Sequence, residues 1–267
     1  MYRVGLVVAL PREIPTGFTR IGDPGVHDGS PLPFYRRLTP TCQLITVQAG
    51  IGSRRAAAGA RVLIQQHCPQ LLMSFGFAGG LVPGLARGTL VIADRLVSED
   101  PEARAYEVDH GLVHQLLTAA RSERLPVQRG AIVTTRHAVT SEASKVALAQ
   151  TSGASAVDME TWGIAQVACQ AGIPWVAVRA IVDAVADPLP SACVTALDNN
   201  GRVMLRRLSR EVWRSPRVIG DLFWLAQCTA LARRRLSRLL RCLPLFPSDS
   251  MSMGGRLRME GRSDGPF

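Results

Sequence analysis

The sequence predicts an α/β fold in which a central sheet is covered by helices on both faces. Short β-branched apolar runs alternate along the chain with segments of helical periodicity, an alternation typical of such folds. The chain has 267 residues, of which 47% are apolar, so a single domain can bury a full core. This composition excludes wholesale disorder.

The elements follow in order along the first 190 residues. The expected strands are Val4–Leu10, Leu44–Ala49, Leu71–Phe75, Leu90–Ala93, Ala131–Thr134 and Trp175–Ile181. The expected helices are Ser53–Gln66, Asp109–Arg124, Thr140–Gln150 and Thr161–Ala171. Residues 14–41 are rich in Gly and Pro, so we expect a loop or a hairpin insert there.

Positive charge is concentrated near the carboxyl end. Residues 202–241 hold eleven arginines against two acids, which is nearly all of the chain's net charge of +10. Helices are expected over Val203–Trp213 and Arg217–Leu240, and residues 247–267 have no periodicity and are expected to be a disordered tail. A membrane surface or a nucleic acid would contact the basic segment. No aromatic interleaving or nucleic-acid module accompanies it, so nucleic acid is not predicted as a partner.

Cysteine and hydropathy patterns indicate a cytoplasmic protein. The six cysteines are scattered without a CxxC motif, which favours reduced thiols over a disulfide framework. No run of eighteen apolar residues is present, and the apolar run at the start is too short for a secretory signal. His110 and His114 lie four apart without a third ligand nearby, so we expect no metal and no cofactor.

Three acids and one glycine-rich stretch lie at the ends of predicted strands and helices. Glu13 comes after the first strand, Glu160 precedes a helix, and Asp183 ends the last strand. Two of these acids also have a structural interpretation. Glu13 is suited to the first turn of a helix, and Asp183 is suited to a loop or a helix cap. Asp158 is expected to cap the helix, which leaves Glu160 without that role. Ser74–Gly80 lets a ligand approach the backbone, although by itself it is equally consistent with a tight turn.

Taken together, Glu13, Glu160 and Asp183 indicate chemistry. Several acids converging on one cleft is a catalytic pattern. Cleavage of an N-glycosidic bond needs an acid for the leaving base, a base for the nucleophile and a group that holds the sugar.

At these residues the chain resembles the methylthioadenosine/S-adenosylhomocysteine nucleosidases and the purine nucleoside phosphorylases. The matching stretches are Gly5–Glu13, Ala49–Gly52, Gly76–Gly80 with Gly84 and Gly88, Arg129-Gly130, Val157–Glu160, Arg179–Asp183 and Ala186-Asp187. The resemblance implies a three-layer α/β/α sandwich with a mixed, partly barrel-like sheet. It also implies a catalytic domain over residues 1–201, extended by a basic helical segment at 202–246.

The resemblance assigns roles residue by residue. Glu13 is similar to the base that activates water, and Asp183 to the acid that protonates the purine at N7. Met159 and Glu160 resemble the ribose-binding pair. The remaining expected substrate-binding positions are Gly76, Phe77, Ala78 and Gly79 in the glycine-rich stretch, and Ala138 and Val139, where the backbone would meet the adenine edge.

Departures from the family pattern bear on the nucleophile. Phosphorylases of this kind usually hold phosphate with an arginine and a serine, and here those positions are Ser74 and Phe77. Water is therefore favoured, although Arg54, Arg55 or Arg136 could substitute and so leave phosphate open. Val182 replaces a serine that often precedes the aspartate, so Asp183 is expected to lose one orienting hydrogen bond.

A narrower resemblance concerns the substrate. Ser74–Leu81, Thr140–Lys145, Gly153–Glu160, Leu189-Pro190 and the Arg-rich segment with Ser215-Pro216 are similar to the hopanoid-associated phosphorylases. That similarity implies adenosylhopane as the substrate, cleaved to ribosylhopane and adenine. Residues 203–241 would then contact the inner face of the membrane, unless they only pack on the body. The alternatives are a soluble methylthioadenosine, adenosylhomocysteine or futalosine nucleosidase, or a purine nucleoside phosphorylase, and the family implies a homodimer or larger homo-oligomer.

Overall fold

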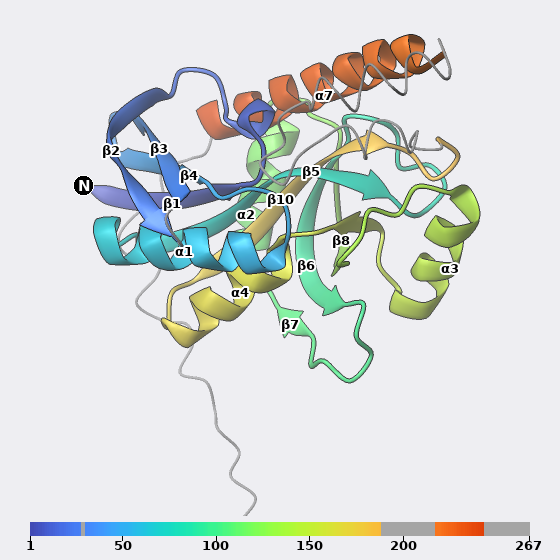
Figure 1. The fold of residues 1–267 in the computed structure, drawn as a ribbon, viewed down its shortest axis with the longest axis horizontal. Helices are drawn as coiled ribbons and strands as arrows, with labels where there is room; N and C mark the ends of the chain where they lie inside the picture. Colours follow the sequence, from blue (N-terminus) through green and yellow to red (C-terminus); the bar gives the residue numbers. More distant parts are fainter. Residues whose placement is uncertain (28–29, 188–216, 243–267) are drawn as a thin grey trace, which may run out of the picture.

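The computed structural model describes residues 1–27, 30–187 and 217–242, which form a mixed sheet with helices on both faces (Figure 1). The α/β class predicted from the sequence is therefore confirmed. The expected helix at 203–213 and the expected tail at 247–267 lie outside the described residues.

Four parallel strands form the part of the sheet on which the site is built. In spatial order they are β4 (Cys42–Gln48), β1 (Tyr2–Val8), β5 (Leu71–Gly80) and β10 (Trp175–Asp183). All three pairings between these neighbours are parallel, so their carboxyl ends meet at one edge. Ligands bind at that edge in open α/β sheets.

The Gly- and Pro-rich insert is a hairpin. Strands β2 (Thr19–His27) and β3 (Ser30–Leu38) pair antiparallel with each other, and β3 pairs antiparallel with β4. The hairpin therefore extends the sheet beyond β4, away from β10.

The other end of the sheet closes on itself. Strands β6 (Leu90–Ser98), β8 (Val127–Thr134) and β9 (Ala156–Asp158) continue the order from β10 back to β5. Because β10 pairs with both β5 and β6, these five strands form a ring, and a short strand β7 (Tyr106–Glu107) pairs with β6 outside it. This closure confirms the mixed, partly barrel-like sheet.

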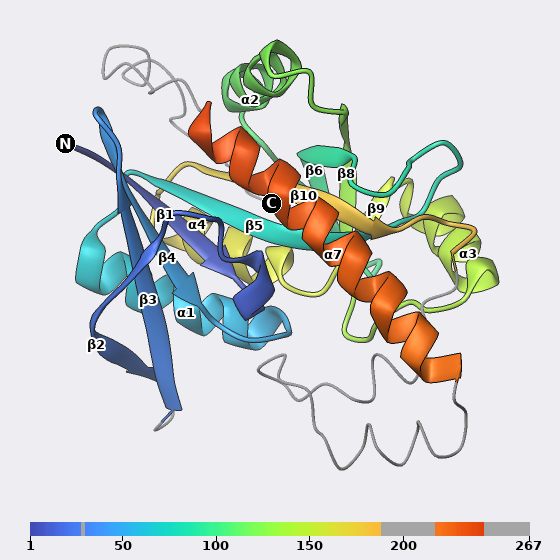
Figure 2. The same cartoon turned by 90° about the horizontal axis from the view of Figure 1, so that it is seen from above.

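Helices cover the two faces. Figures 1 and 2 show α1 (Ser53–His67) and α4 (Thr161–Gln170) on one face and α7 (Arg217–Arg241) crossing the other. The remaining helices are α2 (His110–Ser122), which packs on β6 and β8, α3 (Glu142–Ser152), and the single turn η1 (Pro11–Glu13) after β1.

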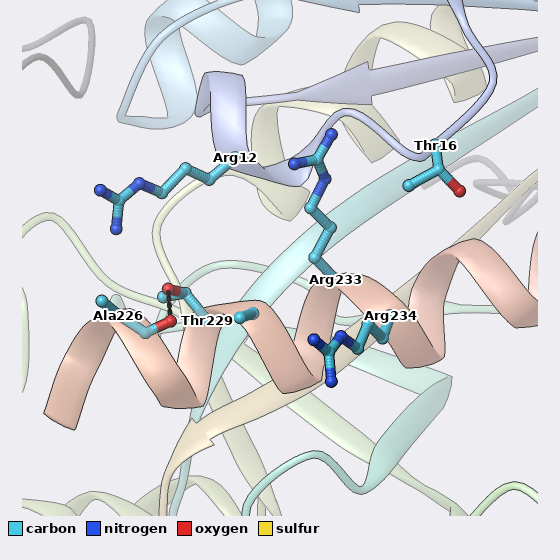
Figure 3. Close-up of a pocket in the computed structure, with 7 residues that line it drawn as sticks. Arg12, Thr16, Ala226, Thr229, Arg233 and Arg234 are labelled. Atoms are coloured by element: carbon cyan, nitrogen blue, oxygen red, sulfur yellow. Dashed lines mark hydrogen bonds between the residues drawn. The ribbon is translucent and has the colours of Figure 1, made fainter. Parts of the chain in front are cut away.

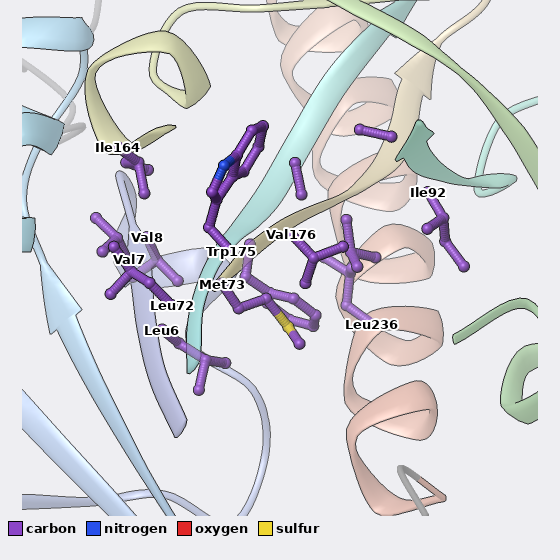
Figure 4. Packing of buried hydrophobic residues seen from close by; sticks show 14 of the residues in the cluster. Leu6, Val7, Val8, Leu72, Met73, Ile92, Ile164, Trp175, Val176 and Leu236 are labelled. Atoms are coloured by element: carbon purple, nitrogen blue, oxygen red, sulfur yellow. The ribbon is translucent and has the colours of Figure 1, made fainter. Parts of the chain in front are cut away.

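The long basic helix α7 is part of the core. Its residues Ala232, Leu236, Leu239 and Leu240 are buried in the same apolar cluster as the strands. Figure 4 shows Leu236 beside Val176 of β10. No helix among residues 1–27, 30–187 and 217–242 is long and apolar enough to cross a membrane.

Candidate functional site

The three predicted acids are buried at the ends of elements. Glu13 closes the turn η1 after β1, Asp183 is the last residue of β10, and Glu160 precedes α4. Their exposed fractions are only 3%, 3% and 7%. Burying a carboxylate costs folding free energy unless the carboxylate is paired or hydrogen-bonded. The partners of each acid therefore determine its chemistry.

Glu13 is held by backbone N–H groups. Its Oε2 accepts hydrogen bonds from Ala9 N at 2.7 Å and Leu10 N at 2.8 Å, and its Oε1 accepts from Phe77 N at 2.8 Å. Burial raises the pKa of Glu13 above its ordinary value, although Arg179 and the three N–H donors oppose that rise. The carboxylate therefore links the loop after β1 to β5.

The glycine-rich stretch is a strand, so the reading of Ser74–Gly80 as a tight turn is wrong. β5 continues to Gly80 because β10 pairs with it along this length, with Gly76 opposite Arg179 and Gly79 opposite Asp183. A Cβ at Gly76 would overlap Arg179 Nη1 and Glu13 Oε1. Glycine is thus required there by the charged groups that lie over the strand.

Arg179 is a buried cation of the site, and no role was predicted for it from the sequence. Its Nη2 lies 2.5 Å from Asp158 Oδ2 and donates to Ser74 Oγ at 2.9 Å and Thr161 Oγ1 at 2.8 Å. Its Nε and Nη1 are buried without a hydrogen-bond partner in the described structure. An arginine inside an otherwise apolar strand was the available signal, since a buried charge must be paired.

Asp158 combines two structural functions. It accepts a hydrogen bond from Thr161 N, the first residue of α4, at 3.1 Å, as expected of a capping acid, although the N-cap position itself is occupied by Glu160, whose side chain makes no capping bond. The same carboxylate pairs with Arg179 and accepts from Thr134 Oγ1 at 2.7 Å. These contacts leave it little capacity for a ligand.

Glu160 is more weakly held. Its Oε1 accepts from Gly52 N at 3.1 Å, and its Oε2 lies 3.8 Å from Arg179 Nη2. Burial, with the nearby charges of Asp158 and Glu13, raises the pKa of Glu160 to about 7. Its neighbour Met159 is half-buried. Glu160 therefore keeps acceptor capacity for a hydroxyl-rich ligand.

Asp183 has a partner that the sequence reading missed. Lys145 of α3 places its Nζ 2.5 Å from Asp183 Oδ2, and the lysine side chain is fully buried. Burial raises the pKa of Asp183 above its ordinary value, although Lys145 opposes the rise. No local pattern marked Lys145, because a lysine on a polar helix ordinarily faces solvent.

The remaining predicted positions surround this centre. Phe77 contributes its N–H to Glu13 and its ring to the main core, and Ala78 is buried beside it in β5. Ala138 and Val139 lie in the loop between β8 and α3 with half-buried side chains. Contact of this loop with an adenine edge stays a prediction.

The charges around Arg179 determine what the site can bind. Three carboxylates, those of Glu13, Asp158 and Glu160, influence one guanidinium, whereas Asp183 lies against Lys145. This excess of carboxylate favours a ligand that develops positive charge and disfavours an anion. Among the described residues no group of three or more His, Cys, Asp or Glu could hold a metal ion.

A separate cation-lined hollow lies where η1 meets α7 (Figure 3). Its volume is about 370 Å³, and its lining residues are Arg12, Thr16, Ala226, Thr229, Ala230, Arg233 and Arg234. Arg233 Nε donates to Ile14 O at 3.0 Å, which joins α7 to the segment after Glu13. None of the described residues that line the hollow carries a carboxylate, so its chemistry suits an anionic group.

Comparison with known proteins identifies the family of the chain. The phosphorylase superfamily model matches residues 3–214. The 5'-methylthioadenosine/S-adenosylhomocysteine nucleosidase of Staphylococcus aureus is 24% identical over 195 residues, covering 67% of this chain and 86% of that protein. The nucleosidase of the same name from an Exiguobacterium species is 30% identical over 167 residues, covering 56% and 71%.

Solved structures share the fold. S-adenosylhomocysteine nucleosidase from Streptococcus pyogenes superposes with a TM-score of 0.66 at 22% identity, over 91% of this chain and 98% of that one. A futalosine hydrolase mutant from Helicobacter pylori gives a TM-score of 0.64 at 19% identity, over 90% and 99%.

Proposed function

Because the chain belongs to the phosphorylase superfamily, we propose that it is a nucleosidase that hydrolyses the bond between adenine and ribose. The observation that carries this proposal is the burial of Glu13, Glu160 and Asp183 at one sheet edge with distinct partners. Each acid is thereby suited to a different step of N-glycoside cleavage.

In the proposed reaction, Asp183 donates a proton to N7 of the purine as the bond between C1' and N9 breaks. The bonding electron pair leaves with adenine, and positive charge develops on the ribose. Glu13 accepts a proton from water as the water oxygen attacks C1', and Glu160 accepts hydrogen bonds from the ribose hydroxyls. The unpartnered Nη1 of Arg179, beside Glu13 over Gly76, supports a place for that water.

Replacing Glu160 tests the sugar-binding role. We expect Glu160→Gln to lower the rate, yet to raise the melting temperature at pH 8.5, because a carboxylate with a raised pKa costs folding energy once ionised. Raising the pKa from 4.5 to about 7 costs about 3 kcal/mol above pH 8, and the cost shrinks as pH falls toward 4.5.

Kinetics and thermal melts from pH 5 to 8.5 measure both effects, with Glu142→Gln as the control on exposed α3. If wild type cleaved a 2'-deoxy substrate as fast as the ribonucleoside, the proposed hydrogen bonds from the ribose hydroxyls to Glu160 would be contradicted.

The charge balance supports water over phosphate as the nucleophile. A phosphate would enter a site where carboxylates outnumber guanidinium groups, with the Ser74 hydroxyl already bonded to Arg179 and the Phe77 ring in the core. Arg136, one possible substitute ligand, pairs with Glu99 at 3.0 Å on the surface. Desolvating a phosphate in that setting is unfavourable.

We therefore expect free ribose products with or without phosphate in the buffer. Mass spectrometry of the sugar released from an adenine nucleoside measures this directly. A ribose 1-phosphate product that depends on added phosphate would show that the enzyme is a phosphorylase.

For the substrate we propose a lipid-linked adenosine, adenosylhopane, cleaved in the cytoplasm at the membrane surface. The relatives named above support the alternative of methylthioadenosine, adenosylhomocysteine or futalosine equally well. The feature that favours the lipid is the outer surface of α7. Its exposed residues recur at helical spacing and comprise Gly220, Phe223, Gln227, Ala230, Arg234, Arg238 and Arg241.

This outer stripe carries both apolar and basic side chains. Phe223 is 66% exposed near one end, while the arginines gather at the other. The buried side of α7 already packs on the body, so among the described residues of this helix the stripe is the part available for docking. A basic residue near an anionic surface contributes about 1 kcal/mol, and the hollow beside Arg234 suits a lipid phosphate.

We expect Phe223→Ser/Arg234→Gln/Arg241→Gln to lose sedimentation with anionic vesicles and turnover of vesicle-borne adenosylhopane, while keeping turnover of methylthioadenosine. These positions avoid Arg233 and Arg238, which bond to Ile14 O and Glu123 of the body. Arg61→Gln/Arg121→Gln removes the same charge elsewhere as the control. Wild-type sedimentation by the stripe variant, or equal loss on both substrates, would refute membrane docking.

A further inference from the structure

Lys145 is a buried cation on a helix whose other residues are exposed or half-buried. It is the one buried residue of α3, and its side chain has no exposed surface. Burying an ammonium is costly unless oxygen atoms replace its water. The placement of Lys145 therefore calls for an explanation beyond helix packing.

Three oxygens surround the lysine nitrogen. Nζ lies 2.5 Å from Asp183 Oδ2, and it donates to Ala184 O at 2.7 Å and to Asp187 O at 2.9 Å. A neutral amine carries two N–H bonds, whereas an ammonium carries three, one for each of these acceptors. The three acceptors thus match the three N–H bonds of an ammonium.

The other groups around Asp183 are few. Gly79 of β5 lies close enough that a Cβ there would be 3.3 Å from Asp183 Oδ2. Asp187 is the nearest further acid, and it is occupied by Ala184 N at 2.9 Å and by Arg87 at 3.2 Å. Lys145 is therefore the cation that faces the Asp183 carboxyl directly within the described residues.

We propose that Lys145 is the positioning residue of the general acid: it holds Asp183 at the end of β10 and makes it a stronger acid as the base departs. The inference rests on the proposed nucleosidase function. N7 of an adenine nucleoside is a weak base, so the donor must give up its proton readily. When the proton moves from Asp183 to N7, the electron pair stays on the carboxyl oxygen, and the new carboxylate lies against the ammonium of Lys145.

The pKa of Asp183 is raised by some neighbours and lowered by Lys145, which is consistent with this role. Burial and Asp187 raise its pKa, which favours the protonated form, and Lys145 lowers it. Removing the lysine charge should therefore leave Asp183 protonated to higher pH but less able to donate.

The test compares Lys145→Met with wild type on two substrates. On an adenine nucleoside we expect kcat to fall by roughly 10- to 100-fold, part of the range for general-acid catalysis, with KM little changed. The alkaline limb of the kcat/KM profile should move to higher pH. On 4-nitrophenyl riboside, whose phenolate leaves without protonation, the variant should react at nearly the wild-type rate.

A purely structural lysine would lower both rates together and leave the alkaline limb in place, and that result would overturn the proposal. Lys145→Gln keeps N–H donors for Ala184 O and Asp187 O without the charge. If the methionine variant does not fold, the rates of this variant on the two substrates are compared with wild type instead. Wild-type protein that cleaves no adenine nucleoside would instead refute the proposed function itself.

Discussion

Asp183→Asn is expected to lower the rate of adenine release by about 10²–10⁴-fold, the usual contribution of a general acid. Asparagine retains the shape of the side chain and an acceptor for Lys145, but it has no proton to give to N7. Adenine would then have to leave as a poor, anionic leaving group. The measurement is the rate of adenine release, followed by chromatography, at a temperature where circular dichroism shows a folded protein.

The same substitution should also cost some stability. Above the raised pKa of Asp183, Lys145 would lose its counter-charge in a buried setting, and breaking a buried pair in this way typically costs about 3–5 kcal/mol. Asp94→Asn is the matched control, because Asp94 pairs with Arg129 on the surface of β6. Full activity in a folded Asp183→Asn protein would remove Asp183 from the mechanism.

Glu13→Gln is expected to have an effect of similar size, about 10²–10⁴-fold, through loss of the general base. The two oxygens of Glu13 accept from Ala9 N, Leu10 N and Phe77 N. A glutamine amide would turn N–H donors toward one of these N–H groups, so both the base and its position are lost. The readout is kcat/KM for the same adenine nucleoside.

The pH profile distinguishes the base from a structural anchor. Glu13 acts as a carboxylate and burial raises its pKa, so the wild-type rate should fall as pH decreases through that raised value. Asp183 acts protonated, so the rate should also fall as pH rises through its own raised pKa. Glu13→Gln should abolish only the acidic limb that Glu13 controls. Glu123→Gln, at the surface pair with Arg238, serves as control, and an unchanged acidic limb would exclude Glu13 as the base.

These two results would bear on different halves of one reaction. The acid lies at the end of β10 with a lysine, and the base lies after β1 among backbone N–H groups. Burial raises the pKa of both carboxyl groups, and their partners, Lys145 for Asp183 and the backbone N–H groups with Arg179 for Glu13, oppose that rise. The proposed roles therefore differ in the partners and the position of each acid.

Local patterns in the sequence determined the secondary structure and the identity of the acids. Apolar runs predicted six strands of the sheet, β1, β4, β5, β6, β8 and β10, because a buried strand needs continuous apolar side chains whatever it packs against. The short strands β7 and β9 were not predicted. The positions of Glu13, Glu160 and Asp183 at the ends of elements followed from the same periodicity. Residues 14–41 were left open between a loop and a hairpin, and pairing with β4 selected the hairpin.

Only the tertiary structure determined the partners of those acids and the direction in which their pKa values shift. Whether Ser74–Gly80 is a turn or a strand depends on β10, which lies about a hundred residues further along the chain and pairs with it. Arg179 and Lys145 owe their roles to burial against carboxylates from other elements. Such contacts arise from long-range packing, which sets the dielectric and the charge around each group, and no residue spacing within one segment encodes them.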